Sequence, residues 1–530
     1  MFAALQSSHR VDVERPAFES SNACKLSAPQ RIREGVLASR DPERPNVLFI
    51  ISDDQGAWAL GCAGNPEIKT PVLDRLAASG IRFENFFCTS PVCSPARASL
   101  LTGDIPSRHG VQDWIRAGSM GDSRIDYLEG QRLITDVFAD AGYRCGLIGK
   151  WHLGASDRPR SNFVKWFAHQ SGMGPYYDAP MVDGDRPIVL SGYITEELGK
   201  QAVAFVAEEA ERPEPFWLSL NFTAPHYPWI NSHPREFTDI YEDCPFESCP
   251  EEPPHPDFAG GHAAVEKGTE QRRESLAGYF ASVTAMDAVI GKVIAELERR
   301  DLTRSTLVVF MSDNGMNCGH HGIWGKGNGT RPQNMYDTSI KVPCIMSQPG
   351  RIPGDLVSDD LLSGYDVYPT LVEFAGVSEE AVSHSAKPGR SFAALLCGTK
   401  IAGDRDVVVY DEYGPVRMVR TREWKYVHRY PDGPHELFDL VADPGERANR
   451  IADPILGDIV STLSNQLMRW FAAYVDPRRD AVEKGVTGCG QLGRPEDATA
   501  TRPMFADRHL NGADWDLWLS DGNPAPQAPE

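Results

Sequence analysis

The sequence predicts an α/β fold: a mostly parallel central sheet sandwiched by helices, followed by a smaller antiparallel sheet with one helix. Short, uninterrupted apolar runs predict the large sheet, because they are typical of strands buried on both faces. These runs lie at residues 46–52, 146–149, 216–221 and 307–312. Helical patterns separate them, as expected where helices connect parallel strands.

Two helices can be placed between these strands. One follows the first strand: Thr70 can cap it, Pro71 suits its first position and Gly80 ends it. A longer amphipathic helix precedes the strand at 307–312, and Asp287 on its polar side is interpreted as a structural residue. Its apolar residues recur at three- and four-residue steps: Leu276, Phe280, Val283, Met286, Ile290, Val293 and Leu297.

The pattern changes beyond about residue 400. Short apolar runs at 407–410, 417–420, 425–428 and 436–439 predict an antiparallel sheet, and a helix is predicted from about Pro454 to Val475. The chain therefore divides into an N-terminal arm (1–43), a catalytic domain (44–400), a C-terminal subdomain (401–475) and a tail (476–530). The tail is rich in proline, glycine and aspartate, and we expect a surface wrap or a partly disordered segment.

Composition excludes several classes of function. The 530 residues carry a net charge of −21, which argues against a nucleic-acid partner, since such proteins normally present a basic face. No run of about 18 apolar residues predicts a membrane span. The first residues lack the pattern of a secretory signal, so we expect a cytoplasmic protein. The 11 cysteines show no framework spacing and are interpreted mainly as small buried residues.

Polar side chains follow two of the predicted strands. Asp53 and Asp54 come directly after the first strand, and Asp313 and Asn314 come after the strand at 307–312. Ligands gather at the carboxyl ends of parallel strands, so these side chains are expected to form one site. Carboxylate and amide oxygens suit Ca²⁺ or Mg²⁺ better than zinc.

Cys93 has an unusual setting, in the stretch SPVCSPARASLLTG at residues 90–103. If Pro95 opens a short helix that ends at Gly103, Cys93 lies at the helix N-terminus, where negative charge is favoured by about 0.3–1 kcal/mol. Arg97 lies one turn further on and can face the same side. The arrangement predicts an anion site with a nucleophile at its mouth.

Further basic residues can complete this site. Lys150 and His152 are two residues apart, and on an extended segment they point the same way, as a charge clamp and an acid or base. His226 follows the strand at 216–221, and Lys326 lies in a glycine-rich loop after the candidate metal ligands.

Together these residues resemble the type I sulfatase family of the alkaline phosphatase-like superfamily. Cys93-Ser-Pro-Ala-Arg97 with Leu100-Leu-Thr-Gly103 is similar to the family's Cys-x-Pro-x-Arg signature, and GYRCGLIGKWH at residues 142–152 is similar to its second signature. Within the resemblance, which runs from about residue 45 to 475, further positions match the family's metal and cationic positions: Asp53, Asp54, Asp313, Asn314, His226 and Lys326.

The resemblance implies a sulfatase that hydrolyses sulfate monoesters, with a sulfated carbohydrate as the favoured substrate and an aryl or small alkyl sulfate as the next. It implies that a maturation enzyme converts Cys93 to Cα-formylglycine, whose hydrate attacks sulfur beside a bound Ca²⁺, or Mg²⁺. Asp53, Asp54, residue 93, Asp313 and Asn314 would hold the cation. Arg97 and Lys150 would steady the hydrate and His152 would accept its proton. Lys150, His226 and Lys326 would hold the sulfate, and His226 or Lys326 would assist the leaving oxygen.

Some positions depart from the family or leave alternatives open. Where many relatives carry Glu-Gly-Gly-x-Arg-x-Pro, this chain has residues 336–343, so that Asp337 and Lys341 stand in. His320 and His321 are adjacent but lack spacing for a zinc site, although one of them could line the substrate pocket. The rival functions are a phosphonate or phosphodiester hydrolase, a hydrolase with an unmodified cysteine, and a non-catalytic anion-binding protein.

Overall fold

The computed structural model describes residues 41–259, 270–377, 387–400, 409–499 and 503–507. The predicted arm lies outside the described residues except for 41–43, as does the end of the tail. All described residues belong to one compact unit, so the boundary between the catalytic domain and the C-terminal subdomain at residue 400 stays a prediction.

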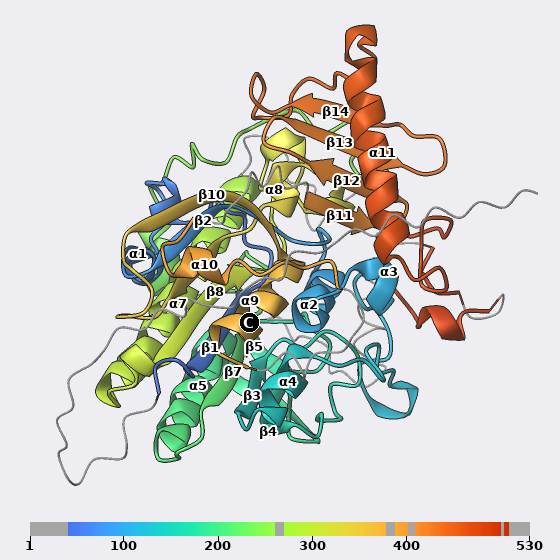
Figure 1. Ribbon diagram of the computed structural model, residues 1–530. Coiled ribbons are helices and arrows are strands. Elements are labelled where there is room, and N and C mark those ends of the chain that lie inside the picture. Colours follow the sequence, from blue (N-terminus) through green and yellow to red (C-terminus); the bar gives the residue numbers. More distant parts are fainter. Residues whose placement is uncertain (1–40, 260–269, 378–386, 401–408, 500–502, 508–530) are drawn as a thin grey trace, which may run out of the picture. The chain divides into compact units, whose positions relative to one another are not determined.

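A ten-stranded sheet forms the centre of the described chain, in the order β10-β2-β9-β8-β1-β7-β3-β4-β5-β6 (Figure 1). The central pairs around β1, β7 and β3 are parallel, as predicted, whereas β9, β5 and β6 pair antiparallel with their neighbours. The strands are β1 (Asn46–Ser52), β2 (Ile81–Phe87), β3 (Arg144–Gly149), β4 (Phe163–His169), β5 (Tyr177–Asp183), β6 (Arg186–Tyr193), β7 (Phe216–Asn221), β8 (Thr306–Ser312), β9 (Cys344–Ser347) and β10 (Leu356–Ser363).

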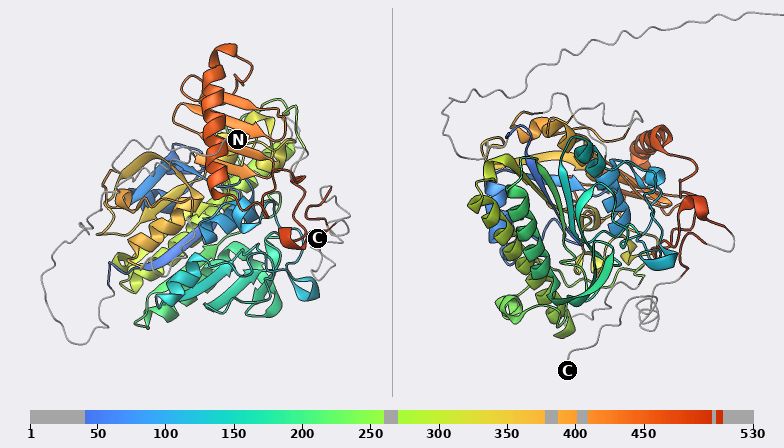
Figure 2. Two further views of the ribbon diagram at one scale, coloured as in Figure 1. Left: turned by 45° about the vertical axis from the view of Figure 1, so that its right-hand side comes forward. Right: turned by 90° about the horizontal axis from the view of Figure 1, so that it is seen from below.

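Helices cover both faces of the sheet (Figure 2), because successive residues of a buried strand face opposite sides. Leu48 and Ile50 of β1 pack in one apolar cluster with α5 and α7, while Phe49 and Ile51 pack in another with α2, α4 and α9. The helices are α1 (Pro71–Ala78), α2 (Cys93–Thr102), α3 (Pro106–His109), α4 (Ile134–Asp140), α5 (Ile194–Ala210), α6 (Arg235–Thr238), α7 (Glu270–Arg299), α8 (Asp337–Ile340), α9 (Val367–Phe374) and α10 (Ala393–Leu396).

The N-terminus of α1 differs from the prediction. Thr70 does not cap the helix with its side chain; its hydroxyl donates to Asp74 at 3.0 Å instead. The two oxygens of Asp287 on α7 accept the backbone N–H groups of Val72 and Leu73, at 3.0 and 2.8 Å. The interpretation of Asp287 as structural is confirmed: it caps a neighbouring helix.

The C-terminal region forms a four-stranded antiparallel sheet with a helix across it. Its elements are β11 (Val409–Tyr413), β12 (Val416–Arg420), β13 (Trp424–Arg429), β14 (Glu436–Asp439) and α11 (Gly457–Tyr474). The start of the run predicted at 407–410 lies outside the described residues, and its remainder belongs to β11. Side chains of this sheet join the main apolar cluster, so it packs on the central domain.

The tail is more deeply packed than the sequence predicts. Ala481, Val486, Cys489 and Gln491 are buried, and the segment lies beside α3 in Figure 1. No helix in the described ranges combines the length and the apolar character that crossing a membrane requires.

Candidate active site

Four neighbouring strands deliver the predicted polar residues to one edge of the sheet. The order β8-β1-β7-β3 is parallel throughout, so the segments after these strands meet at their carboxyl ends. They carry Asp313 and Asn314 after β8, Asp53 and Asp54 after β1, His226 beyond β7, and Lys150 and His152 after β3. The structure therefore brings together groups that lie up to 260 residues apart in the chain.

Cys93 enters this cluster at the start of α2, which begins two residues before the predicted Pro95 and ends at Gly103 in a left-handed conformation with φ of 66°. The Cys93 thiol lies 3.3 Å from Asp53 Oδ1 and 3.7 Å from Asp54 Oδ1, and it accepts from the Lys326 ammonium at 2.7 Å. Burial, together with the charge of Asp53, raises the pKa of the thiol well above its ordinary value.

Arg97 projects from the next turn of α2 into the same cluster. Its Nε donates to Asp313 Oδ2 at 2.8 Å, another guanidinium nitrogen donates to the Lys150 carbonyl at 3.3 Å, and the third lies 3.9 Å from Asp53. Although burial disfavours the charged form, Asp313 and Asp53 raise the pKa of Arg97. The guanidinium thus links the ends of three strands.

Two lysines balance the remaining carboxylates. Lys150 Nζ lies 2.5 Å from Asp53 Oδ2, and Lys326 forms an ion pair with Asp54. Burial opposes ionisation of Asp54, but Lys326, His226 and Lys150 outweigh it and hold the Asp54 pKa well below its usual range. Three cationic side chains therefore face three acidic ones, and all six are buried.

The site can accept a divalent cation. Ligand atoms of Asp53, Asp54, Cys93 and Asp313 all lie within 4.8 Å of one another. Asn314 donates through its amide nitrogen to Asp54 at 2.8 Å, which leaves its oxygen buried and without a hydrogen-bond partner among the described residues. Carboxylate oxygens and a free amide oxygen form a hard ligand set, so these residues fit Ca²⁺ or Mg²⁺.

Two histidines border the cluster in their neutral form. His226 Nδ1 lies 2.6 Å from the Tyr227 carbonyl, and its Nε2 lies 3.6 Å from Asp54 Oδ2. Burial lowers the pKa of His226 to about 4, although Asp54 acts against this. Burial and the charge of Lys150 likewise hold the pKa of His152 well below its ordinary value.

His152 differs from the prediction in its backbone. Its φ of 59° is left-handed, so the alternation of an extended segment does not explain its orientation. Its Nε2 lies 3.1 Å from the Ile115 carbonyl, which can only accept, so Nε2 carries the proton. Its Nδ1 is buried and has no partner among the described residues. A free lone pair therefore lies on Nδ1.

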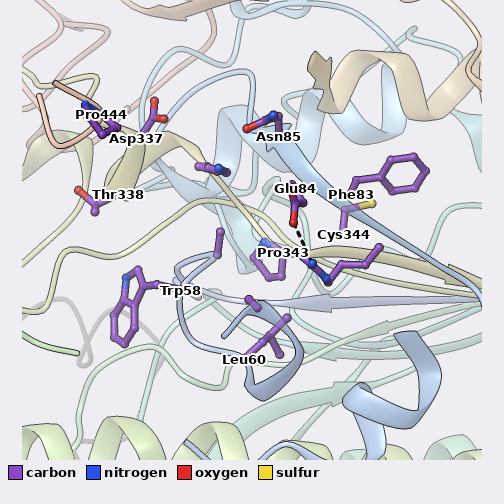
Figure 3. Close-up of a pocket in the computed structure, with 14 residues that line it drawn as sticks. Trp58, Leu60, Phe83, Glu84, Asn85, Asp337, Thr338, Pro343, Cys344 and Pro444 are labelled. Atoms are coloured by element: carbon purple, nitrogen blue, oxygen red, sulfur yellow. Dashed lines mark hydrogen bonds and ion pairs between the residues drawn. The ribbon is translucent and has the colours of Figure 1, made fainter. Parts of the chain in front are cut away.

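Asp337 and Lys341 lie away from this cluster, in a cavity of about 450 Å³ whose lining includes Trp58, Glu84 and Asn85 (Figure 3). The lining includes none of the residues around Cys93. Asp337 also accepts from Arg420 at 2.9 Å and from Lys425 at 2.6 Å, in the C-terminal sheet. Asp337, at the start of α8, therefore links that helix to the C-terminal sheet.

Among the described residues, the groups of possible metal ligands include neither His320 nor His321. His321 stacks on Tyr336 with ring centroids 3.8 Å apart, and His320 packs against Trp58 at 5.4 Å.

His169, at the end of β4, was missed by the sequence reading because β4 itself was not predicted. It is fully buried, and its pKa falls to about 3 through burial and the charges of Lys150 and His226. Its Nδ1 accepts the N–H groups of Ser171 and Gly172, at 3.3 and 3.1 Å. Gly172 in turn packs so closely on His152 that a β-carbon there would lie 2.3 Å from the ring. In the sequence, the nearby glycines Gly172 and Gly174 were the available sign that the backbone packs closely against side chains here.

Two family models match the chain. The Sulfatase model matches residues 45–377, more than half of the chain, and the model for the C-terminal region of N-sulphoglucosamine sulphohydrolase matches residues 319–472. Every predicted site residue lies within the first match.

Characterised relatives agree with the family models. The chain is 29% identical to an ulvan-active sulfatase of Formosa agariphila, over 90% of each chain. It is also 29% identical to a choline-sulfatase of Rhizobium meliloti, over 78% of this chain and 83% of the relative.

Solved structures show the same fold. One, in complex with its substrate D-glucosamine-2-N,6-O-disulfate, has a TM-score of 0.70 at 24% identity and covers 83% of this chain and 100% of that one. A phosphonate monoester hydrolase of Agrobacterium radiobacter has a TM-score of 0.62 at 20% identity, covering 82% and 96%. From these matches, the chain belongs to the sulfatase family, and the protein is a sulfuric ester hydrolase with an alkaline phosphatase-like fold.

Proposed function

We propose that the protein removes sulfate from a sulfated carbohydrate, with formylglycine at position 93 and Ca²⁺ at the acidic cluster. The observation that carries the proposal is the convergence of residue 93 with Asp53, Asp54 and Asp313 within 4.8 Å. Arg97 and Lys326 reach the same point from two other directions. A nucleophile, a cation site and anion-binding side chains thus share one buried volume.

The names of several relatives support a carbohydrate substrate. Besides the ulvan-active sulfatase, the chain is 26% identical to an N-acetylglucosamine-6-O-sulfatase of Bacteroides thetaiotaomicron. It is also 28% identical to the N-acetylgalactosamine-6-sulfatase of Mus musculus over 373 residues, and 29% identical to the human one over 374 residues. The choline-sulfatase and human arylsulfatase A, at 29% and 28% identity, support a small alkyl or an aryl sulfate as the second candidate.

Conversion of Cys93 explains why a thiol stands here. As formylglycine, residue 93 would supply an aldehyde hydrate, of which one hydroxyl attacks sulfur and expels the alcohol. Loss of the proton from the other hydroxyl would then break the C–O bond to sulfate, release sulfate and restore the aldehyde. Because burial keeps the unmodified thiol protonated, a cysteine hydrolase would have a poor nucleophile at this position. A formylglycine-generating maturation enzyme is therefore the implied partner.

His152 is suited to accept the proton of the second hydroxyl. Its Nε2–H is committed to the Ile115 carbonyl at 3.1 Å, so the lone pair of Nδ1 is the free base. Its low pKa keeps that lone pair unprotonated at neutral pH. Arg97, held against Asp313, and Lys150, held against Asp53, would keep residue 93 in position.

The sulfate would bind between Lys150, His226 and Lys326. All three side chains are at most 3% exposed, so their attraction to a sulfate oxygen is little screened by water. Lys326 lies closest to residue 93, and an ammonium can give a proton to the departing alcohol oxygen. His226 is the alternative acid.

Asp53, Asp54, Asp313 and Asn314 would hold the cation, together with residue 93. A bound divalent cation would polarise the sulfate oxygens and offset their charge. The oxygen ligands favour Ca²⁺, with Mg²⁺ as the alternative. A phosphonate hydrolase on the same fold is a rival function, but its metal site would more naturally carry histidine where this chain has Asn314.

A substrate panel tests the proposal. The protein is expressed with a maturation enzyme and assayed with sulfated monosaccharides, choline sulfate, an aryl sulfate and a phosphonate ester. The proposal predicts the highest kcat/KM for a sulfated sugar. Higher kcat/KM for choline sulfate or the aryl sulfate would contradict the proposed carbohydrate substrate. Preference for the phosphonate ester would overturn the sulfatase assignment. Cys93→Ala is the control and should abolish turnover of every ester.

A further inference from the structure

The tail lies beyond both family matches. It contacts the loop after α3, whose Ile115 carbonyl accepts a hydrogen bond from His152. Residues 486–491 lie outside residues 45–377 and 319–472, yet Gln491 is fully buried. It forms a parallel bridge with Ile115, in the loop after α3, and an antiparallel bridge with Phe505. The tail therefore adds a short strand beside the active-site loop.

The bridge between Gln491 and Ile115 is formed by hydrogen bonds to the two residues that flank Ile115. The Gln491 N–H donates to the Trp114 carbonyl at 2.7 Å, and the Gln491 carbonyl accepts the Arg116 N–H at 2.9 Å. These bonds leave the N–H and carbonyl of Ile115 itself directed away from the tail. Ile115 N–H donates to Ser94 Oγ at 3.0 Å, and its carbonyl accepts from His152 Nε2 at 3.1 Å. One residue thus contacts the neighbour of Cys93 and the ring of His152.

The side chain of Gln491 anchors the tail in this register. Its Oε1 accepts the N–H groups of Gln112 and Asp113, at 2.7 and 3.3 Å, and its Nε2 donates to the Gly110 carbonyl at 3.0 Å. Gly490 adds a bond from its N–H to Asp113 Oδ2 at 3.0 Å. A buried amide with every hydrogen-bonding group used specifies one arrangement of the loop.

The tail also reaches the loop that carries Lys326. The Gly488 carbonyl accepts from Trp114 Nε1 at 3.0 Å and from Asn328 Nδ2 at 3.2 Å. Gln333 donates to the Val486 carbonyl at 3.0 Å. The segment 486–491 therefore contacts both the loop that contains Ile115 and the loop that contains Lys326.

We propose that Gln491 is a positioning residue that sets the orientation and tautomer of His152 by fixing the Ile115 carbonyl. Without the bridge that carbonyl is free to turn, and His152 loses the acceptor that keeps the proton on Nε2 and the lone pair on Nδ1. The inference rests on the proposed role of His152 as the base.

The test compares variants of the full-length, matured protein on the best ester of the panel. Gln491→Ala is expected to lower kcat about 10- to 100-fold, with KM within about twofold of wild type, because His152 acts in turnover rather than in binding. Arg494→Gln is the matched control: it removes exposed tail contacts to Asp497 and Glu129, and should leave kcat unchanged.

A double-mutant cycle separates positioning from general damage. If Gln491 acts through His152, Gln491→Ala should cost less than about twofold in a His152→Ala background. An equal loss of kcat in both backgrounds, or unchanged kcat in Gln491→Ala alone, would overturn the proposal. Should Gln491→Ala not fold, Gly490→Ala replaces it: its β-carbon would lie 2.7 Å from Arg116 Cβ, which must displace the bridge.

A spectroscopic readout keeps this test independent of activity. In ¹⁵N-labelled wild type, the His152 ring should show the Nε2–H tautomer, assigned with His152→Gln, and Gln491→Ala should shift or exchange-broaden that signal. An unchanged His152 signal in the variant would contradict the positioning role. If wild type hydrolyses no sulfate ester, the proposed function fails, yet this signal still decides the role of Gln491.

Discussion

At the scale of single residues, Arg97 makes contacts that an ammonium could not make together. Its planar guanidinium reaches Asp313, the Lys150 carbonyl and the neighbourhood of Asp53 in one plane of donors. These groups come from the ends of three strands. The shape of the side chain, and not its charge alone, therefore sets the geometry of the site.

Arg97→Lys is accordingly expected to lower kcat about 100-fold while the protein stays folded, because a point charge cannot hold Asp313 and the Lys150 carbonyl at once. Steady-state kinetics on the best ester measures the loss. Arg108→Lys, in a partly exposed pair with Asp104, is the control and should retain full activity. Full kcat in Arg97→Lys would refute the geometric argument.

The sequence can predict that polar residues following neighbouring parallel strands lie together, but it cannot predict an orientation that the backbone conformation sets. Asp53, Asp54, Asp313 and Asn314 could be named because strand ends converge in any parallel sheet. The free lone pair on His152 could not, since it depends on a left-handed backbone and on the carbonyl of a residue 37 positions away.

At the scale of elements, the capping of α1 shows how a helix can be completed by a distant side chain. Asp287 on α7 accepts two N–H groups at the start of α1. Its pKa is raised to about 6, mainly by burial, against the effect of those hydrogen bonds. The folded protein therefore holds the Asp287 proton more tightly than the unfolded chain does.

This difference predicts a pH dependence of stability. A raised carboxyl pKa gives stability that is full below the unfolded value of 3.8 and is lost as pH rises through about 6, up to about 3 kcal/mol. Asp287→Asn does not titrate, so its free energy of unfolding relative to wild type should rise between pH 4 and pH 7. Urea unfolding at several pH values measures this.

The control for that prediction is Glu298→Gln, an exposed position on the same helix. Its free energy of unfolding relative to wild type should change little across the same pH range. A constant difference between Asp287→Asn and wild type would mean that the Asp287 carboxyl titrates alike in both states.

Strands were predicted unevenly for a physical reason. β1, β7 and β8 are buried on both faces and read as continuous apolar runs, so their bounds were predicted to within one residue. β2 has a half-exposed Arg82 and an exposed Glu84, and β6 alternates in burial along its length. Such strands need their neighbours to be recognised, which a single sequence does not supply.

At the scale of the whole molecule, a buried ionic contact joins the C-terminal sheet to helix α8 of the central domain. Lys425 on β13 is fully buried and pairs with Asp337 of α8 at 2.6 Å and with Glu446. Breaking a buried pair by removing one partner typically costs about 3–5 kcal/mol, because a charge is left unpaired. Apolar residues of both regions share one cluster, so the described chain should unfold cooperatively.

Lys425→Met should therefore lower the free energy of unfolding by about 3 kcal/mol or more, measured in urea. Arg478→Met is the control, since its pair with Asp476 is formed by an arginine that is 84% exposed and should contribute little to stability. Equal effects of the two variants would show that the buried contact adds no more than a surface pair.

Cation binding should also stabilise the whole protein. A ligand that binds only the folded state at 100 times its Kd adds about 2.7 kcal/mol, so Ca²⁺ should raise Tm and a chelator should lower it. Asp54→Asn removes a ligand and should abolish most of the Ca²⁺ effect, whereas Asp432→Asn, at an exposed position, should keep it. If adding Ca²⁺ leaves the Tm of the wild-type protein unchanged, the proposed metal site is refuted.

The tail shows what the sequence could not reveal at this scale. Its composition predicts a surface segment, and nothing beside Gln491 in the sequence marks that residue as buried. Its burial arises from a loop almost 380 residues earlier, through the bond from Gln112. Contacts of this kind depend on the assembled fold.

The central claim is that residue 93 works as formylglycine, and mass spectrometry of the peptide containing residues 88–97 tests it most directly. The peptide is taken from preparations made with and without a maturation enzyme, and each is assayed on the same sulfate ester. The account predicts an aldehyde at position 93, in a fraction that rises in proportion to kcat. Full turnover by protein that carries only the unmodified thiol would contradict it.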